Sequence, residues 1–269
     1  MTSVQPTLIY ICISYNNRYI HLLDILLKSI YKYTPIHSMH IYIIACKTTR
    51  PLVEDLINVN QYQNVYIKSS IPCINHLRNN KNAKLLEAAC QKLLIFEHNI
   101  DIYTNILYLD TDIISTGDIS PIFNLPQDHK IYTLPEGKIT LNGKGSGPWG
   151  GKFFRNDKKY INHSGINSGI MAFRVCDSVS NIFKITLEHI HQHLHSGKPI
   201  PGCKEQPFLS YNTIVNNMIN NNDLPTYAML HPRPVPENTY KLLNHFSGWV
   251  GDADYKIKKM KQFYEKYIK

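Results

Sequence analysis

The chain lacks the features that mark membrane-spanning, secreted and zinc-binding proteins. No run of about 18 apolar residues occurs in its 269 residues, so no integral membrane segment is expected. No basic flank followed by an apolar core stands near the start, so no secretory signal is expected. The six cysteines lie far apart, and no pair has the spacing of a zinc knuckle or a redox motif. We therefore expect a protein of a reducing, cytoplasmic compartment.

Acidic residues are scarce relative to basic ones. The chain has 20 Asp and Glu against 29 Lys and Arg, which gives a formal net charge of +9. Such an excess favours anionic partners, for example a phosphorylated small molecule. Nucleic acid is not predicted, because the sequence has no stripe of basic and aromatic residues and no recognisable reading motif. The abundance of Ile, Asn, Lys and Tyr is typical of AT-rich genomes, viral genomes included.

Apolar β-branched runs alternate with segments of helical periodicity along most of the chain. Strands are predicted at 7–13, 40–45, 64–67, 106–109 and 170–175, and helices at 19–31, 52–57, 83–96, 177–195, 206–219 and 253–267. This alternation predicts an α/β fold with a doubly wound, mostly parallel central sheet. Residues 135–160 have no periodicity and contain five glycines between 143 and 151, so a flexible loop is expected there.

Two carboxylates, Asp110 and Asp112, directly follow the apolar strand predicted at 106–109. Open α/β sheets bind ligands at the carboxyl ends of strands, and side chains two residues apart in an extended segment point the same way. Two oxygen ligands there could hold a divalent cation that keeps positions free for a phosphate-bearing substrate. The alternative is a solvated turn that contains two Asp by chance. In either case, carboxylates at a solvated strand end are expected to contribute little to stability.

Four further segments accompany Asp110-Thr111-Asp112 in a specific order and spacing. They are Lys92-Leu93-Leu94-Ile95-Phe96, Asn167-Ser168-Gly169-Ile170-Met171, Glu205-Gln206-Pro207-Phe208 and His245-Phe246-Ser247-Gly248. Over roughly residues 7–262, this pattern resembles glycosyltransferase family 8, the glycogenin-like and bacterial galactosyltransferase-like retaining enzymes.

The resemblance implies one glycosyltransferase domain of the GT-A (Rossmann-like) type over residues 1–269. Residues 7–134 would form the nucleotide-binding half, and 161–269 would form the sugar and acceptor half with the C-terminal helix. The implied reaction moves a hexose from a UDP-sugar, UDP-glucose or UDP-galactose, to an unknown glycan or protein acceptor with retention of configuration. Mn²⁺ would bridge the diphosphate, held by Asp110, Asp112 and His245. An imidazole beside two carboxylates suits a transition ion better than magnesium.

The resemblance also assigns the residues that would contact the nucleotide. They are Ser14, Tyr15, Asn16, Tyr19, Asp110, Thr111 and Gly248, with Arg78 as a further candidate donor contact. The family usually carries a lysine three residues after the position of Gly248, but this chain has Gly251 there. Lys256 is the candidate to reach the phosphate instead.

The sugar-binding residues implied by the resemblance are Lys92, Asn167, Ser168, Glu205 and Gln206, and those with catalytic roles are Lys92, Glu205 and Gln206. Lys84 competes with Lys92 for the role of the basic residue beside the sugar and metal. Glu205 stands where the family has Asp, and its extra methylene could change the choice of donor. Glu205 could instead be an ordinary helix-start residue that the helix dipole favours.

Two other functions stay open at this point. A haloacid-dehalogenase-like phosphatase also places Asp-x-Asp after an apolar strand, and Gly251-Asp252-Ala253-Asp254 resembles its late acidic motif. Against this reading, about a hundred residues precede the first Asp-x-Asp, whereas that motif usually lies near the N-terminus. A catalytically degenerate protein that binds a UDP-sugar without turnover is the second alternative. The sequence leaves open whether the chain forms a homodimer.

Overall fold

The computed structural model describes residues 7–13, 15–74, 81–139, 150–156, 158–160, 162–248 and 250–269. Its strands are β1 (Thr7–Cys12), β2 (Met39–Ala45), β3 (Val65–Ser69), β4 (Asn105–Leu109), β5 (Ile113–Ser115), β6 (Ile131–Lys138), β7 (Ser164–Arg174), β8 (Ile219–Asn220), β9 (Ala228–Leu230) and β10 (Leu243–His245). Its α-helices are α1 (Tyr19–Tyr33), α2 (Arg50–Asn60), α3 (Lys81–Cys90), α4 (Asp177–His195), α5 (Gln206–Val215) and α6 (Ala253–Tyr267).

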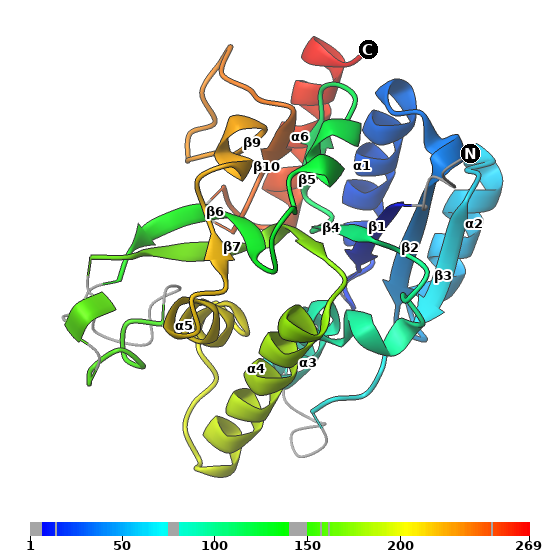
Figure 1. Ribbon diagram of the computed structural model, residues 1–269. Coiled ribbons are helices and arrows are strands. Elements are labelled where there is room, and N and C mark those ends of the chain that lie inside the picture. Colours follow the sequence, from blue (N-terminus) through cyan, green and yellow to red (C-terminus); the bar gives the residue numbers. More distant parts are fainter. Residues whose placement is uncertain are drawn as a thin grey trace, which may run out of the picture.

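A seven-stranded sheet in the order β3-β2-β1-β4-β7-β6-β8 forms the centre of the molecule (Figure 1). Strands β3, β2, β1 and β4 run parallel, while β7 is antiparallel to both β4 and β6. The sheet is therefore mostly parallel, as the sequence predicts. Its parallel half places the carboxyl ends of β1 and β4 side by side, at the edge of the sheet where the site described below lies.

The side chains of alternate strand residues pack on opposite faces of this sheet. On one face, Ile9 and Ile11 of β1 pack with α1 and α2. On the other, Leu8 and Tyr10 pack with α3, α4 and α5. Two helical layers therefore enclose the sheet, which explains why β1 and β4 read as continuous apolar runs.

A second sheet, in the order β5-β10-β9, joins distant parts of the chain. Strand β10 pairs antiparallel with β5, so that His245 lies opposite Ile113. The backbone N–H of Phe246 donates to the carbonyl of Asp112 at 2.9 Å, which continues this pairing. Helix α6 packs against α1 beside this sheet, in a cluster that includes Leu22, Phe246 and Met260.

Several elements differ from their predicted bounds. Helix α2 is longer than expected, and the helix predicted at 83–96 is α3 followed by a 3-10 segment, Gln91–His98. Strand β6 continues to Lys138, so residues 135–138 do not belong to the loop predicted at 135–160. Residues 140–149 of that loop lie outside the described residues. Helices α4 and α6 have the predicted bounds.

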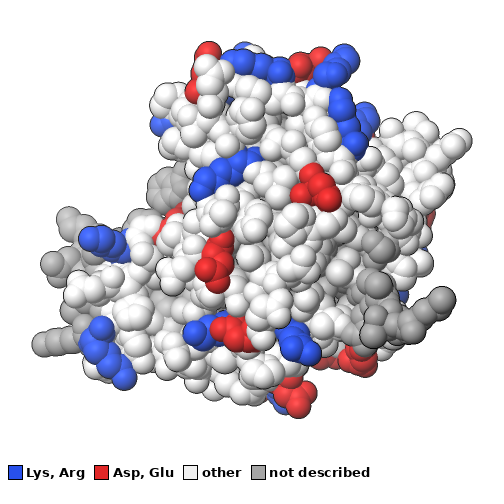
Figure 2. Space-filling view, turned by 45° about the horizontal axis from the view of Figure 1, so that its top comes forward, with Lys and Arg blue, Asp and Glu red and all other residues white. Residues whose placement is uncertain are grey.

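None of the described helices is long and apolar enough to cross a membrane. Figure 2 shows one face of the molecule, where basic and acidic side chains are mixed among many uncharged ones.

Candidate active site

A cavity of about 460 Å³ opens at the carboxyl ends of β1 and β4. Its wall includes Cys12 at the end of β1 and Asp110, Thr111 and Asp112 after β4. Its volume lies in the range of small-molecule sites, and its position is that at which open α/β sheets bind ligands.

Asp110, Asp112 and His245 bring their ligand atoms together in this cavity. Nε2 of His245 lies 3.1 Å from Oδ1 of Asp112 and 4.0 Å from Oδ2 of Asp110. One ligand atom from each residue fits within 4.8 Å of the others. The pairing of β10 with β5 produces this geometry. It places His245 opposite Ile113 and therefore next to Asp112, which is 133 positions earlier in the chain. The predicted metal ligands therefore meet.

Hydrogen bonds around His245 show which nitrogen of its imidazole ring is turned to the two carboxylates. Its Nδ1 lies 3.1 Å from Oδ1 of Asn167, and the same oxygen accepts the N–H of Gly169 at 3.0 Å. Since an amide oxygen only accepts, Nδ1 donates to Asn167, and Nε2 is turned to the two carboxylates. Oδ1 of Asp112 accepts no aligned hydrogen bond from any described residue. Two carboxylates and an imidazole nitrogen that converge on one point form the donor set of a cation site.

Gly169 leaves the space that this cluster occupies. A Cβ on Gly169 would lie 2.2 Å from Cε1 of His245 and 2.8 Å from Oδ2 of Asp110. The backbone there is not in the left-handed region, so the glycine is required by the closeness of these side chains rather than by its dihedral angles. Its carbonyl also accepts a hydrogen bond from the N–H of Asp110 at 2.8 Å, which connects β7 to the loop that follows β4.

Lys256 of α6 forms an ion pair with Oδ2 of Asp112, and both side chains are buried. Burial alone would raise the pKa of the Asp112 carboxyl, but the Lys256 ammonium and His245 hold it well below its usual value. Likewise, the carboxylate raises the pKa of Lys256 against the effect of burial. The expectation of a solvated strand end is wrong for Asp112, which is 5% exposed. Loss of its charge would leave a buried ammonium unpaired.

The local structure explains why this chain has Gly251 at the position where the family usually carries a lysine. This residue has a φ of 146°, which side chains other than glycine rarely adopt, and a Cβ there would lie 3.1 Å from Cδ1 of Tyr255. A lysine is therefore disfavoured at this position. Lys256, one turn into α6, lines the same cavity and supplies an ammonium next to Asp112.

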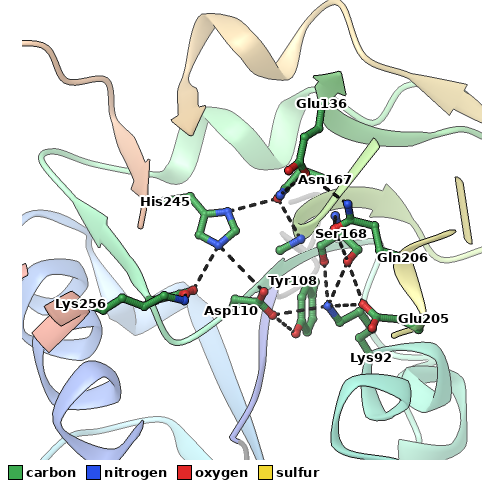
Figure 3. A network of polar contacts seen from close by, with 12 residues as sticks. Lys92, Tyr108, Asp110, Glu136, Asn167, Ser168, Glu205, Gln206, His245 and Lys256 are labelled. Atoms are coloured by element: carbon green, nitrogen blue, oxygen red, sulfur yellow. Dashed lines mark hydrogen bonds and ion pairs between the residues drawn. The ribbon is translucent and has the colours of Figure 1, made fainter. Parts of the chain in front are cut away.

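Lys92 lies in the centre of a second polar cluster (Figure 3). Its Nζ is 2.9 Å from Oε1 of Glu205 and 3.5 Å from Oδ1 of Asp110, and it donates to the carbonyl of Ser168 at 3.0 Å. Burial alone would lower the pKa of Lys92, but the Asp110 and Glu205 carboxylates raise it above its usual value, so the ammonium stays charged. Lys84 is exposed on α3 and is not among the residues that line the cavity.

Glu205 and Gln206 begin α5 but turn their side chains into the cavity. Glu205 makes no side-chain cap of the helix; instead its Oε1 accepts from Ser168 Oγ at 2.8 Å. Oε1 of Gln206 lies 3.3 Å from the same hydroxyl, and its Nε2 donates to Glu136 at 3.2 Å. Glu205 is 3% exposed and pairs with Lys92, so its role is not that of a surface residue at a helix start.

The predicted nucleotide contacts are only partly gathered at the cavity. Tyr19, Thr111, Gly248 and Lys256 line it, whereas Tyr15 and Asn16 are not among its lining residues. Asn16 is exposed, and its Oδ1 accepts from the N–H of Arg18 at 3.1 Å. Ser14 and Arg78 lie outside the described residues.

Sequence reasoning missed several residues of the cavity wall, among them Cys12, Tyr108, Glu136 and Cys203. Tyr108 donates a short hydrogen bond to Oδ1 of Asp110. The centroid of its ring lies 4.8 Å from Nζ of Lys92. The spacing of Tyr108 and Asp110 along β4 could have indicated this contact. Glu136 lies in a strand that periodicity did not reveal, so no local signal pointed to it.

The acidic segment that suggested a phosphatase has structural roles. Oδ1 of Asp252 accepts the N–H of Tyr255 at 2.9 Å and caps α6. Asp254 is exposed and pairs with Arg18. Neither is among the residues that line the cavity.

Three comparisons with known proteins address the class of this fold and site. The model of the family described as Glycosyl transferase family 8 matches residues 10–196, and the chain belongs to this family. The match covers Lys92, Asp110, Asp112 and Asn167 and ends before Glu205. No curated protein matches the chain.

Solved glycosyltransferases have the same fold. Mouse xyloside xylosyltransferase 1 aligns with a TM-score of 0.63 at 11% identity, over 93% of this chain and 100% of the other. Galactosyltransferase LgtC, solved with donor and acceptor sugar analogues, aligns with a TM-score of 0.62 at 12% identity, over 98% of this chain and 96% of the other. The bifunctional glycosyltransferase WbbM gives 0.62 at 13% identity, over 100% of this chain and 52% of the other.

Family and fold together define a GT-A nucleotide-sugar glycosyltransferase, and members of the family bind a nucleotide-sugar donor and an acceptor. Enzymes of this family typically use a divalent metal, and Asp110, Asp112 and His245 form a candidate site for one.

Proposed function

We propose that this protein is a Mn²⁺-dependent retaining glycosyltransferase that moves a hexose from UDP-glucose or UDP-galactose to a glycan or protein acceptor. The observation that carries the proposal is the convergence of Asp110, Asp112 and Nε2 of His245 on one point of a ligand-sized cavity. These three residues would hold Mn²⁺, which would supply positive charge that stabilises the departing UDP.

In this proposal, the nucleotide lies at the side of the cavity lined by Tyr19, Thr111, Gly248 and Lys256. A Cβ on Gly248 would have no neighbour within 4 Å, which leaves room for a diphosphate against the backbone. The Lys256 ammonium sits beside Asp112 and adds a fixed positive charge close to where the phosphates would bind. Tyr19 offers an aromatic ring to the uridine.

The sugar lies, in the same proposal, against the cluster formed by Lys92, Asn167, Ser168, Glu205 and Gln206. Glu205 holds the sugar hydroxyls, and the amide of Gln206 lies near the anomeric carbon. Lys92 links both ends of the donor, because its ammonium contacts Asp110 at the metal and Glu205 at the sugar.

A screen of UDP release tests the proposal without knowledge of the acceptor, because water can accept the sugar. Purified protein is incubated with Mn²⁺ and a series of nucleotide sugars, including UDP-glucose, UDP-galactose and UDP-xylose. We expect UDP release from a UDP-hexose that chelator abolishes. Asp110→Asn should lose this activity, while Asp101→Asn, which removes an exposed carboxylate that precedes β4 and does not line the cavity, should keep it.

The outcomes separate the alternatives. UDP binding without release from any donor would indicate a degenerate binding protein. Release that persists in chelator would contradict the metal assignment, and release from UDP-xylose alone would contradict the hexose assignment.

A further inference from the structure

Glu136 of β6 is a buried carboxylate in the cavity wall, and none of the roles proposed above uses it. Its Oε2 accepts two hydrogen bonds, from Nδ2 of Asn167 at 2.8 Å and from Nε2 of Gln206 at 3.2 Å (Figure 3). Glu136 is 8% exposed, and these two hydrogen bonds offset the cost of burying its carboxylate. Both of its donors are amides of residues proposed to hold the donor sugar.

The pairing of β6 with β7 places Glu136 within reach of Asn167. Glu136 lies opposite Gly165, so Asn167 is its diagonal neighbour on the same face of the sheet. Register shifts on both sides of Glu136 make this part of the ladder irregular. Such irregularities often redirect a side chain next to an active site.

Glu136 determines how the amide of Asn167 is turned. Because a carboxylate only accepts, Asn167 must present its NH₂ group to Glu136 and its oxygen to the opposite side. That oxygen accepts from Gly169 N at 3.0 Å and faces His245 Nδ1 at 3.1 Å. A reversed amide would set its NH₂ group against both donors. Through Asn167, the carboxylate therefore holds an acceptor against Nδ1 of His245 and keeps Nε2 turned to Asp110 and Asp112.

The same carboxylate orients Gln206. With Nε2 held by Glu136, Oε1 of Gln206 is directed to the backbone N–H of Ser168 at 3.4 Å and its hydroxyl at 3.3 Å. One charged group therefore sets the orientation of two amides, one at the metal ligand and one beside the sugar.

We propose that Glu136 is a positioning residue that couples the metal ligand His245, through Asn167, to the orientation of Gln206. This inference rests on the proposed function, because it concerns residues that are proposed to bind the metal and the donor sugar in the same cavity. It predicts that a change at Glu136 affects metal affinity and turnover together, although Glu136 touches neither His245 nor a bound cation. A residue that merely stabilised β6 would affect neither property in a folded protein.

Glu136→Gln and Glu136→Leu test this proposal. Calorimetry with Mn²⁺ alone should show about 10- to 100-fold weaker binding for Glu136→Leu, the usual effect of losing an outer partner of a metal ligand. UDP release should fall by a similar factor. Glu136→Gln keeps an acceptor oxygen in the same place and should recover part of both losses. Thr133→Val, which removes a buried hydroxyl from the same strand, is the matched control and should change neither.

Nitrogen and proton NMR of the ring of His245 supplies a readout that needs no metal. The wild type should show an Nδ1 proton that Asn167 holds and protects from exchange with water, and Glu136→Leu should lose this protection. Unchanged protection of the Nδ1 proton and unchanged Mn²⁺ affinity in a folded Glu136→Leu would overturn the proposal. If the wild type binds no Mn²⁺, the proposed function fails, and the protection of the Nδ1 proton still decides the role of Glu136. If Glu136→Leu does not fold, Glu136→Gln decides: wild-type values in all three measurements would equally overturn the proposal.

Discussion

Replacing Gly169 by alanine is the sharpest single perturbation of the candidate metal site. The added Cβ would lie 2.2 Å from Cε1 of His245 and 2.8 Å from Oδ2 of Asp110. The backbone of Gly169 lies outside the left-handed region, so alanine fits its dihedral angles. The whole effect of the substitution therefore falls on the two proposed ligands rather than on the local chain conformation.

The size of the effect follows from contact distances. Two carbon atoms pack at about 3.5 Å or more, so the ring of His245 must retreat by about 1.3 Å. Metal–ligand distances tolerate only about 0.2 Å, so we expect Mn²⁺ affinity to fall at least about tenfold. The overpacking itself should cost about 1–3 kcal/mol, which corresponds to a melting temperature lower by about 2–10 °C.

Calorimetry with Mn²⁺ and thermal unfolding measure these two effects on the same sample. Gly202→Ala is the matched control, because a Cβ on Gly202 would have no neighbour within 4 Å. It should leave both values at those of the wild type. A folded Gly169→Ala protein that binds Mn²⁺ as tightly as the wild type would refute the placement of the cation between His245 and Asp110.

Three further predictions concern residues around the same cavity. Lys256→Met should weaken UDP binding by about tenfold or more in calorimetry, since it removes a charge proposed to face the diphosphate; unchanged affinity would remove Lys256 from the nucleotide site. Asp112→Asn should lower stability by about 3 kcal/mol because it leaves the buried Lys256 ammonium unpaired, and urea unfolding at neutral pH would show this. The folded-state pKa of Asp112 is depressed, so its contribution is present at neutral pH and is lost as the pH falls through the acidic range, where wild type and variant should converge. Glu205→Ala and Gln206→Ala should each reduce turnover by about two orders of magnitude, ~3 kcal/mol of transition-state stabilisation, with less than about threefold change in UDP affinity. Near-normal turnover in both would show that the pair is structural, and Glu205→Asp tests whether the extra methylene governs donor choice.

Local patterns predicted the parts of the fold that local physics determines. The apolar runs of β1, β2 and β4 identify buried parallel strands, and α4 and α6 have the predicted bounds because their amphipathic faces are regular. Strand β6 was missed because Pro135, Glu136 and Gly137 break its alternation. The two-residue strand β8 and the three-residue strands β5, β9 and β10 are too short to produce a periodic signal.

The sequence predicts which residues belong to the site better than it predicts how these residues contact one another. Resemblance to a family indicated Asp110, Asp112 and His245, but only the register of β10 against β5 shows that they meet. The ion pair of Asp112 with Lys256 spans 144 positions and depends on how α6 packs, so no local pattern contains it. For the same reason, the strand-end carboxylate was wrongly expected to be solvated.

The binding of UDP in the presence and absence of Mn²⁺ tests the central claim most directly. UDP is titrated calorimetrically into the wild type with Mn²⁺, with chelator, and into Asp110→Asn with Mn²⁺. If the protein is a metal-dependent UDP-sugar transferase, Mn²⁺ should strengthen UDP binding by at least about tenfold, equivalent to 1.4 kcal/mol. Chelator and Asp110→Asn should each abolish this gain. Equal UDP affinity under all three conditions, or no UDP binding at all, would contradict the account.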